Sequence, residues 1–493
     1  MLFPVGRRET VLLVGGLLLV TAASRPAHAA SKTETVRQSP ASYVVTVPKD
    51  ATVKNLSIAI ENTGSAAVVN PRLTVNGRLD WFDADAIVRE ALGEAKTDEE
   101  KVVALWEFAR TQHQRMTPPG DPLVSDPVVM FNVYGYGNCG CISPALMVLA
   151  QKAGYKARVW ELSGHTVCEV LFDNGWHMMD ADTGRMLRDP DDNHILSVEE
   201  IQDRGLWRVF KKDNRGYEEH GYDKSAFSNH TMALTLRPGE KLTRTWKQSG
   251  KFYNYWARSQ YKPNSGWWLP FSRYASGELV FRPQLTAEAL DRDALAHEAL
   301  IARTEGAAGP ALRVEPAAAG TEKTTNAGQV TYHVASPYVI VGAKLEANFF
   351  RARNTRGGGD WIAVDVRNAW TPDREDAKEG WVLVYGAAWT NDVGELPTVA
   401  DFTDLFNTAD RNKQAIYEYD IRFRFSASDP AQFPVGMSDL VLTTEIQAAP
   451  LAIPALSPGE NSFGYRDETQ GNREVRVTHS WEEAPAAQQS AAQ

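Results

Sequence analysis

Three residues in the middle of the chain have the types needed for nucleophilic catalysis by a thiol. Cys139 offers a sulfur, His165 a base, and Asp180 a carboxylate that could orient the base. A cysteine attacks a carbonyl carbon as its thiolate, which a neighbouring imidazole and a helix N-terminus both stabilise. A carboxylate beside the imidazole fixes its tautomer and stabilises the imidazolium. The sequence therefore predicts a Cys-His-Asp site for acyl chemistry.

The residues after Cys139 predict the helix that would present its sulfur. Gly154 is a natural end for this helix, because glycine readily adopts the left-handed backbone found there. Pro144 falls within this segment, and an alternative start at Ser143 would place this proline in the first turn. Apolar residues recur at helical spacing along the segment: Ile142, Leu146, Leu149 and Ala153.

Three strands are expected after this helix, which makes the segment α+β. They cover residues 156–162, 165–172 and 176–181, and the Asn174-Gly175 dipeptide is a strong hairpin signal between the last two. In this arrangement His165 opens the second strand and Asp180 lies on the third. An earlier helix is predicted by the capping box that Thr97 and Glu100 form.

The expected hairpin register leaves two candidates for the orienting acid. A two-residue turn at 174–175 would place Asp180 opposite Glu169, too far along the strand to touch the imidazole. The same turn would place Asp182 diagonal to His165. Register alone thus favours Asp182, unless a bulge or a wider loop shifts the pairing.

Several motifs in this segment resemble those of the transglutaminase-like superfamily, a group of papain-like Cys-His-Asp cysteine enzymes. The match covers about residues 97–201. The motifs are Tyr136-Gly137-Asn138-Cys139 for the nucleophile, Gly154 and Arg158 for Gly-x-x-x-Arg, His165 and Glu169 for His-x-x-x-Glu, and Trp176 and Asp180 for Trp-x-x-x-Asp.

The resemblance implies Cys139 rather than Cys141 as nucleophile, and Asp180 rather than Asp182 as the orienting acid. It also implies an amide substrate and a thioester acyl-enzyme. Water as second substrate would make the protein a hydrolase (a cysteine protease or amidase), and a lysine amine would make it a crosslinking acyltransferase. We expect hydrolysis, with no cofactor and no metal ligand set.

Two features of the resemblance remain open. Val167 stands where many members have tryptophan, and the oxyanion-hole side chain that some members supply from upstream has no clear equivalent. Gln112 and Gln114 are weak candidates, and the Cys139 backbone N–H is a better one. His177 is expected at the surface, and the acidic residues at 189, 191 and 192 are expected in a solvated turn.

The bulk composition is that of a soluble globular protein of 493 residues, enough for about two to four domains. A formal net charge of −10 and the lack of a long basic block argue against a nucleic-acid partner. Three cysteines do not make a disulfide framework. Cys141 and Cys168 are expected as small buried side chains, or alternatively as one disulfide that leaves Cys139 free.

The N-terminus has the features of a cleavable signal peptide. Arg7 and Arg8 precede an uncharged stretch over residues 11–23, and Ala27-His28-Ala29 has the small-x-small pattern of a cleavage site. The alternative is an uncleaved anchor, and the paired arginines leave twin-arginine export open. We expect a secreted or periplasmic protein with no membrane span after processing. Its expected partner is a protein or peptide substrate, with cell-envelope and glycan-associated proteins among the candidates.

The rest of the chain is expected to be largely β. An alternative function is a noncatalytic cell-surface or glycan-binding scaffold that retains a transglutaminase-like fold. The expected division is a signal peptide (1–29), a β-rich N-terminal module (30–82), the catalytic domain (83–228), an aromatic-rich β module (229–284), a helix and linker (285–328), a β-sandwich (329–482) and a disordered tail (483–493).

Overall fold

The computed structural model describes most of the chain after the predicted signal peptide. Residues 1–27, within the predicted signal peptide, and residues 255–274, within the predicted aromatic-rich β module, lie outside the described residues. Among the described residues, no helix has both the length and the apolar character required to cross a bilayer. The described ranges are 28–116, 120–206, 215–217, 229–254, 275–304, 310–316, 326–351, 360–388, 394–410 and 413–485.

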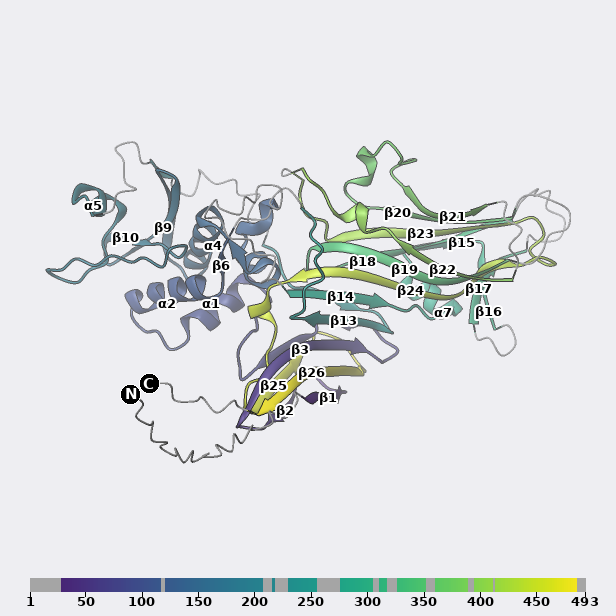
Figure 1. The fold of residues 1–493 in the computed structure, drawn as a ribbon, viewed down its shortest axis with the longest axis horizontal. Helices are drawn as coiled ribbons and strands as arrows, with labels where there is room; N and C mark the ends of the chain where they lie inside the picture. Colours follow the sequence, from purple (N-terminus) through teal and green to yellow (C-terminus); the bar gives the residue numbers. More distant parts are fainter. Residues whose placement is uncertain are drawn as a thin grey trace, which may run out of the picture.

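Helices and a small sheet form the part of the molecule at the left of Figure 1. Its four-stranded antiparallel sheet has the order β10-β9-β8-β11, and helix α4 packs on β8 and β9. The three predicted strands are present and the α+β class is confirmed. The elements are α1 (Ala84–Leu92), α2 (Asp98–Thr111), α4 (Cys139–Lys152), α5 (Val198–Asp203), β8 (Lys156–Leu162), β9 (His165–Phe172), β10 (Gly175–Met179) and β11 (Arg215–Tyr217).

Local sequence signals account for the ends of these helices. Thr97 and Glu100 form the predicted capping box at the start of α2. Asn138 caps α4, where its side chain accepts the Gly140 N–H at 3.1 Å. Gly154 has a φ of 96° just after α4, a backbone conformation that glycine adopts without a steric penalty.

Short elements connect α2 to α4. They lie against the sheets formed by strands β1–β5 and β12–β26, which are together called the β body. Strands β6 and β7 pair in parallel, which brings residues 114–115 beside the chain that leads to Cys139. These connecting elements are β6 (Gln114–Arg115), η1 (Pro122–Ser125), α3 (Pro127–Val129), the π-helical turn η2 (Met130–Tyr134) and β7 (Tyr136–Gly137).

A large sheet carries strands from both ends of the chain. Its main path runs β1-β26-β3-β13-β14-β24-β17-β16, and β19 pairs with both β24 and β22. The strands are β1 (His28–Val36), β3 (Ala51–Asn62), β13 (Glu240–Thr245), β14 (Ala275–Phe281), β16 (Leu300–Thr304), β17 (Pro310–Val314), β19 (Ile340–Arg351), β22 (Gly394–Asp401), β24 (Val435–Ala448) and β26 (Val475–Pro485).

A five-stranded sheet packs on this large sheet through buried aromatic rings. Phe281 and Phe349 from the large sheet meet Tyr332 and Phe423 from the smaller one, with ring centroids 5.6 to 6.3 Å apart. Its order is β15-β18-β23-β20-β21. The strands are β15 (Ala296–Glu298), β18 (Asn326–Ala335), β20 (Trp361–Arg367), β21 (Val382–Ala388) and β23 (Glu418–Ala427).

Smaller elements complete the β body. Strands β2, β25 and β5 form a three-stranded sheet, and β4 pairs with β12. The elements are β2 (Ala41–Val47), β4 (Val68–Val69), β5 (Arg72–Val75), β12 (Thr235–Leu236), β25 (Gly459–Arg466), α7 (Ala287–Asp293), η5 (Thr371–Asp373), η6 (Thr403–Phe406) and η7 (Pro450–Ala452).

The sheet pairing differs from the expected division into separate β modules. Strands β1 and β3 of the predicted N-terminal module both pair with β26, close to the C-terminus. Strand β13, from the predicted aromatic-rich module, pairs with β3. The predicted helix and linker segment contains α7 but also β15, β16, β17 and the start of β18, and β26 extends into the predicted tail. Pairing between distant segments leaves no local pattern in a sequence, which is why it was missed.

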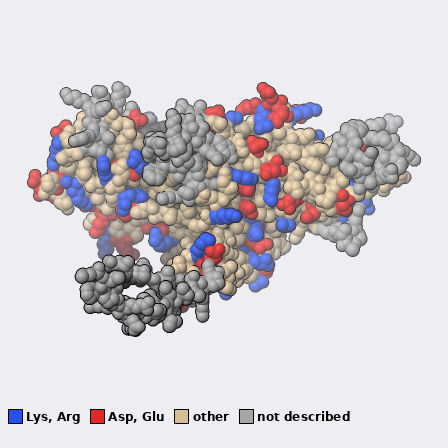
Figure 2. Space-filling view, in the orientation of Figure 1, with Lys and Arg blue, Asp and Glu red and all other residues tan. Residues whose placement is uncertain are grey.

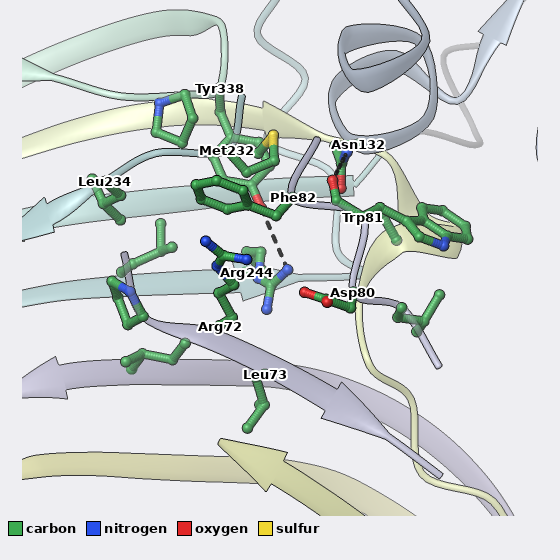
Figure 3. Close-up of a pocket in the computed structure, with 16 residues that line it drawn as sticks. Arg72, Leu73, Asp80, Trp81, Phe82, Asn132, Met232, Leu234, Arg244 and Tyr338 are labelled. Carbon is green, nitrogen blue, oxygen red and sulfur yellow. Dashed lines mark hydrogen bonds between the residues drawn. The ribbon is translucent and has the colours of Figure 1, made fainter. Parts of the chain in front are cut away.

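The α/β part meets the β body at a joint lined by polar and aromatic side chains. The Arg72 guanidinium lies 3.4 Å from the centre of the Phe82 ring, and Asp80 pairs with Arg466. A small cavity of about 60 Å³ lies here (Figure 3), lined by β5, by residues 79–82 before α1, by Asn132 of η2 and by residues of the β body that include Leu242 and Arg244 of β13. On the face shown in Figure 2, acidic and basic side chains are interspersed over the described surface.

Candidate active site

Cys139 is the first residue of helix α4. The structure therefore corrects the alternative start at Ser143, because the helix begins four residues earlier and carries Pro144 in its interior. Pro144 has no N–H to donate to the Gly140 carbonyl, but this loss falls in the first turns of the helix. Cys139 is partly exposed, and its sulfur lies at the positive end of the helix dipole.

The sulfur of Cys139 contacts the start of strand β9. It is hydrogen-bonded to the imidazole of His165, and the Thr166 backbone N–H donates to it as well. Ser143 fixes the helix against the strand, because its hydroxyl donates to the Thr166 carbonyl at 3.0 Å. Residues 26 positions apart are thus brought together by the packing of α4 on β9.

Asp180 holds the far side of the imidazole. His165 Nε2 lies 2.9 Å from Asp180 Oδ2, and the Asp180 side chain is fully buried. The other carboxylate oxygen accepts the backbone N–H groups of Asp182 and Thr183, each at 3.0 Å, and the Thr183 hydroxyl also donates to Asp180. Burial opposes its charge, but these hydrogen bonds prevail and lower its pKa.

The electrostatics of the site favour an ion pair between sulfur and imidazole. Burial works against both charges, yet the mutual hydrogen bond lowers the pKa of the Cys139 thiol. Burial also disfavours the charged form of His165, but its hydrogen bonds to Asp180 and Cys139 raise its pKa to about 9. Each charge therefore stabilises the other, which favours a thiolate–imidazolium pair over the neutral thiol and imidazole.

Asp182 occupies the other side of the same ring. Its Oδ2 lies 4.0 Å from His165 Nδ1 and 2.9 Å from Nε of Arg115, which reaches it from β6. Burial, only partly offset by Arg115, raises the pKa of Asp182 to about 6. Both candidate aspartates thus lie at the site, with Asp180 in hydrogen-bond contact and Asp182 just beyond it.

The predicted register of the β9–β10 hairpin was wrong by two residues. The turn is made by Asp173 and Asn174, which both have positive φ, at 48° and 63°, and Gly175 opens the next strand. Met178, not Asp180, therefore pairs with Glu169. Strand β10 ends at Met179, so Asp180 lies closer to His165 than the predicted turn allows.

Comparison with known proteins agrees with the family that the motifs resemble. A family model described as the transglutaminase-like superfamily matches residues 85–181. The chain contains a transglutaminase-like domain. None of the curated proteins compared with the chain matches it.

Solved structures add no argument about fold or function. The chain aligns with the VP2 subviral particle of infectious bursal disease virus at 7% identity and a TM-score of 0.18, over 94% of this chain and 81% of that one. It aligns with a carbohydrate-binding module of the β-sandwich superfamily at 7% identity and a TM-score of 0.16, over 63% of this chain and 83% of that one. Scores this low carry no weight.

The remaining motif residues of the transglutaminase-like domain have positioning roles. Glu169 is fully buried and accepts hydrogen bonds from Arg158 at 2.7 Å, from Trp160 and from the Val198 N–H at 2.6 Å. The Arg158 guanidinium lies 4.0 Å from the centre of the Trp176 ring. This network ties three strands and helix α5 together away from the thiol.

The β body supports the segment that leads into the transglutaminase-like domain's cysteine. Asp121 is buried and accepts the hydroxyls of Tyr134 at 2.8 Å and of Tyr417, from the β body, at 3.0 Å. The Ala449 N–H donates to the Asn132 carbonyl at 2.8 Å. The segment before Cys139 is therefore held in place by residues of the β body about 300 positions later in the chain.

Gln112 and Gln114 differ in how they lie. The side-chain amide of Gln112 donates a hydrogen bond to the Thr111 hydroxyl at 3.2 Å. Gln114 lies on β6 beside β7, and its side-chain oxygen is buried without a hydrogen-bond partner among the described residues. The upstream position of Gln114 is compatible with a contact near the site.

The other two thiols of the domain differ from Cys139 in their surroundings. All three cysteines are free, and Cys141 and Cys168 are buried as expected. Burial raises the pKa of Cys141 to about 12 and that of Cys168 still further. Cys139 is therefore the cysteine whose surroundings favour the thiolate.

Some side chains near the site were missed or misplaced by sequence reasoning. His177 is buried rather than at the surface, and it contacts the carbonyls of Ile195 and Phe172. Thr183 could have been found from the sequence, because the N–H and hydroxyl of a threonine three residues after an aspartate can donate hydrogen bonds to the aspartate side chain. Arg115 carries no such signal, because only the parallel β6–β7 pairing brings it to Asp182.

Proposed function

We propose that the chain is a cysteine enzyme that cleaves amide bonds through a thioester on Cys139. The observation that carries the proposal is the hydrogen-bonded series from the Cys139 sulfur through the His165 ring to Asp180. It is further supported by the lowered pKa of the one cysteine at a helix N-terminus.

The reaction proceeds in two balanced halves. The Cys139 thiolate attacks the amide carbon, and the His165 imidazolium gives its proton to the leaving amine as the C–N bond breaks. This leaves a thioester and a neutral imidazole. His165 then removes a proton from water, the hydroxide attacks the thioester, and the C–S bond breaks to release a carboxylic acid and the thiolate with its imidazolium partner.

Backbone N–H groups are the proposed donors to the oxyanion. The first four N–H groups of a helix have no carbonyl partner within it, and Cys139 is the first residue of α4. Its own N–H therefore has no carbonyl partner within the helix, and it is the proposed donor to the carbonyl oxygen that the sulfur attacks. A donor of this kind contributes about 3–4 kcal/mol to transition-state stabilisation in other acyl-transfer enzymes.

Hydrolysis is the proposed outcome, with a protein or peptide as substrate. A noncatalytic scaffold is not favoured, because the Cys, His and Asp of the resembled family are present and lie in contact as Cys139, His165 and Asp180. We also propose export, with a mature chain that begins near Ala30. Strand β1 would then keep its pairing with β26 from Ala30, opposite Trp481, to Val36.

The experiment that tests the function is acyl-enzyme trapping. Purified mature protein is incubated with a pool of peptides at pH 7, quenched in acid, and digested for mass spectrometry. We expect an acyl adduct on the Cys139 peptide that decays in water to free carboxylic acid and is missing in Cys139→Ala. An adduct that decays only with an added amine would make the protein a transferase, and absence of adduct and of cleavage would refute the proposal.

A further inference from the structure

Three potential metal ligands converge at the catalytic centre. The Cys139 sulfur, a ring nitrogen of His165 and a carboxylate oxygen of Asp182 all lie within 4.8 Å of one another. A thiolate, an imidazole and a carboxylate are all ligands that Zn²⁺ accepts in proteins. Calcium and magnesium prefer oxygen ligands, so this combination does not suit them.

Asp182 supplies a second and independent indication of a ligand. The residue is 7% exposed, and its side chain is completely buried. Apart from the ion pair with Arg115, neither carboxylate oxygen has a hydrogen-bond partner among the described residues. A buried carboxylate normally accepts several hydrogen bonds, as Asp180 does nearby. Asp182 accepts fewer, so its oxygens can bind a further ligand on the side that faces the His165 ring.

Asp180 prepares the imidazole for a metal on its other nitrogen. It accepts the hydrogen bond from Nε2, which leaves Nδ1 facing Cys139 and Asp182. Histidines that bind metals usually donate their other ring N–H to a carboxylate in this way, which fixes the tautomer and raises the basicity of the ligand atom. Asp180 therefore gives His165 the carboxylate partner that metal-bound histidines usually have on their other ring nitrogen.

We propose that Cys139, His165 and Asp182 form a reversible, inhibitory binding site for Zn²⁺. A tetrahedral ion with ordinary zinc bond lengths would hold these atoms about 3.4–3.6 Å apart. The measured separation of His165 Nδ1 and Asp182 Oδ2 is 4.0 Å, so a small side-chain rotation closes the site. The proton on Nδ1 leaves as the ion binds, and water fills the fourth position.

Inhibition follows from the atoms that the ion would occupy, and this part rests on the proposed function. Zinc would use the sulfur lone pair that attacks the amide and the nitrogen that carries the proton to the leaving group. Binding itself does not depend on catalysis. The Arg115 side chain is 60% exposed and competes with the ion for Asp182, so it sets how tightly zinc binds.

The binding test uses Co²⁺ as a visible stand-in for Zn²⁺ on the full mature chain. We expect one Co²⁺ per protein, with the visible bands of a tetrahedral ion and a thiolate charge-transfer band, and displacement of both by Zn²⁺. Cys139→Ala should abolish the charge-transfer band. Asp182→Asn should weaken Zn²⁺ binding by about 10–100-fold or more, the loss seen even for outer-shell partners. Arg115→Gln should tighten it.

The matched control removes a carboxylate from a different His and Asp group. Asp189, Asp192 and His194 also cluster, and Asp192 is the exposed member of this group, so Asp192→Asn should leave Zn²⁺ affinity unchanged. Equal affinity in wild type and in folded Asp182→Asn, or loss of binding in Asp192→Asn, would overturn the proposal. Amide cleavage that micromolar Zn²⁺ fails to inhibit would overturn the inhibitory role while leaving the enzyme intact. Tight binding without any cleavage would instead count only against the proposed function.

Discussion

The backbone N–H of Asp182 donates a hydrogen bond to the side chain of Asp180 at 3.0 Å. The acid that holds His165 from one side thus also shapes the turn that brings the second acid to the other side of the ring. The two aspartates are coupled, and they are expected to do different work. Asp180 orients the imidazole, whereas Asp182 adjusts the charge around it.

Replacement of the two acids should separate these roles. Asp180→Asn should lower kcat/KM by about 10²–10⁴-fold, since the analogous loss in a serine triad costs about 10⁴. Asp182→Asn should retain activity within about tenfold. Its charge raises the pKa of Cys139, so its removal should shift the acid limb of the kcat/KM profile to lower pH. Steady-state kinetics from pH 4 to 10 measure both effects, and equal losses in the two variants would contradict the assignment.

Asp182 should also make the stability of the protein depend on pH. Its pKa is raised to about 6 from an ordinary value of about 3.9, because burial disfavours the charged form. A carboxyl group with a raised pKa adds stability that is fully present below about pH 3.9 and is lost as the pH rises through about 6. Between pH 5 and pH 8, wild type should lose about 1–1.5 kcal/mol relative to Asp182→Asn.

Urea unfolding of both proteins at the two pH values measures this difference. Asp191→Asn serves as control, because Asp191 lies at the surface and the variant should show no such change. If the unfolding free energies of wild type and Asp182→Asn differ by the same amount at pH 5 and at pH 8, folding does not raise the pKa of Asp182.

The loop before Cys139 should depend on a glycine that packs against the β body. Gly135 has a φ of 66°, and a methyl group there would lie 2.9 Å from the Ala449 Cβ. Gly135→Ala should destabilise the protein by about 2–4 kcal/mol, from backbone strain and from overpacking. Gly77→Ala is the matched control, because Gly77 has a φ of 73° but open space around it.

The control variant should lose only about 1 kcal/mol, because it suffers the backbone strain alone. Thermal unfolding of both variants measures the difference. Equal destabilisation would mean that the contact between Gly135 and Ala449 does not hold the loop, and the support of Cys139 by the β body would then need another origin.

The buried Glu169 network should contribute stability without taking part in the chemistry. Glu169→Gln removes the charge that Arg158 pairs with, and should cost about 1–3 kcal/mol of unfolding free energy. Glu161→Gln on β8, which is exposed, should cost nothing measurable. A pH profile of kcat/KM that keeps its shape in Glu169→Gln confirms a structural role, whereas a shifted profile assigns Glu169 to the catalytic ionisations.

Sequence reasoning succeeded where spacing within one segment carries the information. The bounds of β8 and β9, the capping box at Thr97 and the helix that presents Cys139 all follow from local patterns. The predicted hairpin register was wrong by two residues. The turn is formed by Asp173 and Asn174, which both have positive φ, and not by Asn174 and Gly175 as predicted. Asparagine and aspartate tolerate that conformation, so the sequence alone admits either turn.

The long-range relationships were out of reach for a different reason. Nothing in residues 28–62 reveals that their strands pair with β26, more than 400 positions later. Arg115 reaches Asp182, and Tyr417 reaches Asp121, only through the packing of the whole chain. The core of the candidate site is thus readable from motifs, whereas the groups that adjust its electrostatics are not.

The most direct test of the central claim is the rate at which iodoacetamide alkylates Cys139 at pH 6. The His165 imidazolium should keep the sulfur ionised there, so wild type should react at least about tenfold faster than His165→Ala. Peptide mapping by mass spectrometry should place the label on Cys139 and not on Cys141 or Cys168. A rate that equals that of His165→Ala, and that rises only as the pH approaches the ordinary thiol pKa of about 8.5, would contradict the thiolate–imidazolium pair.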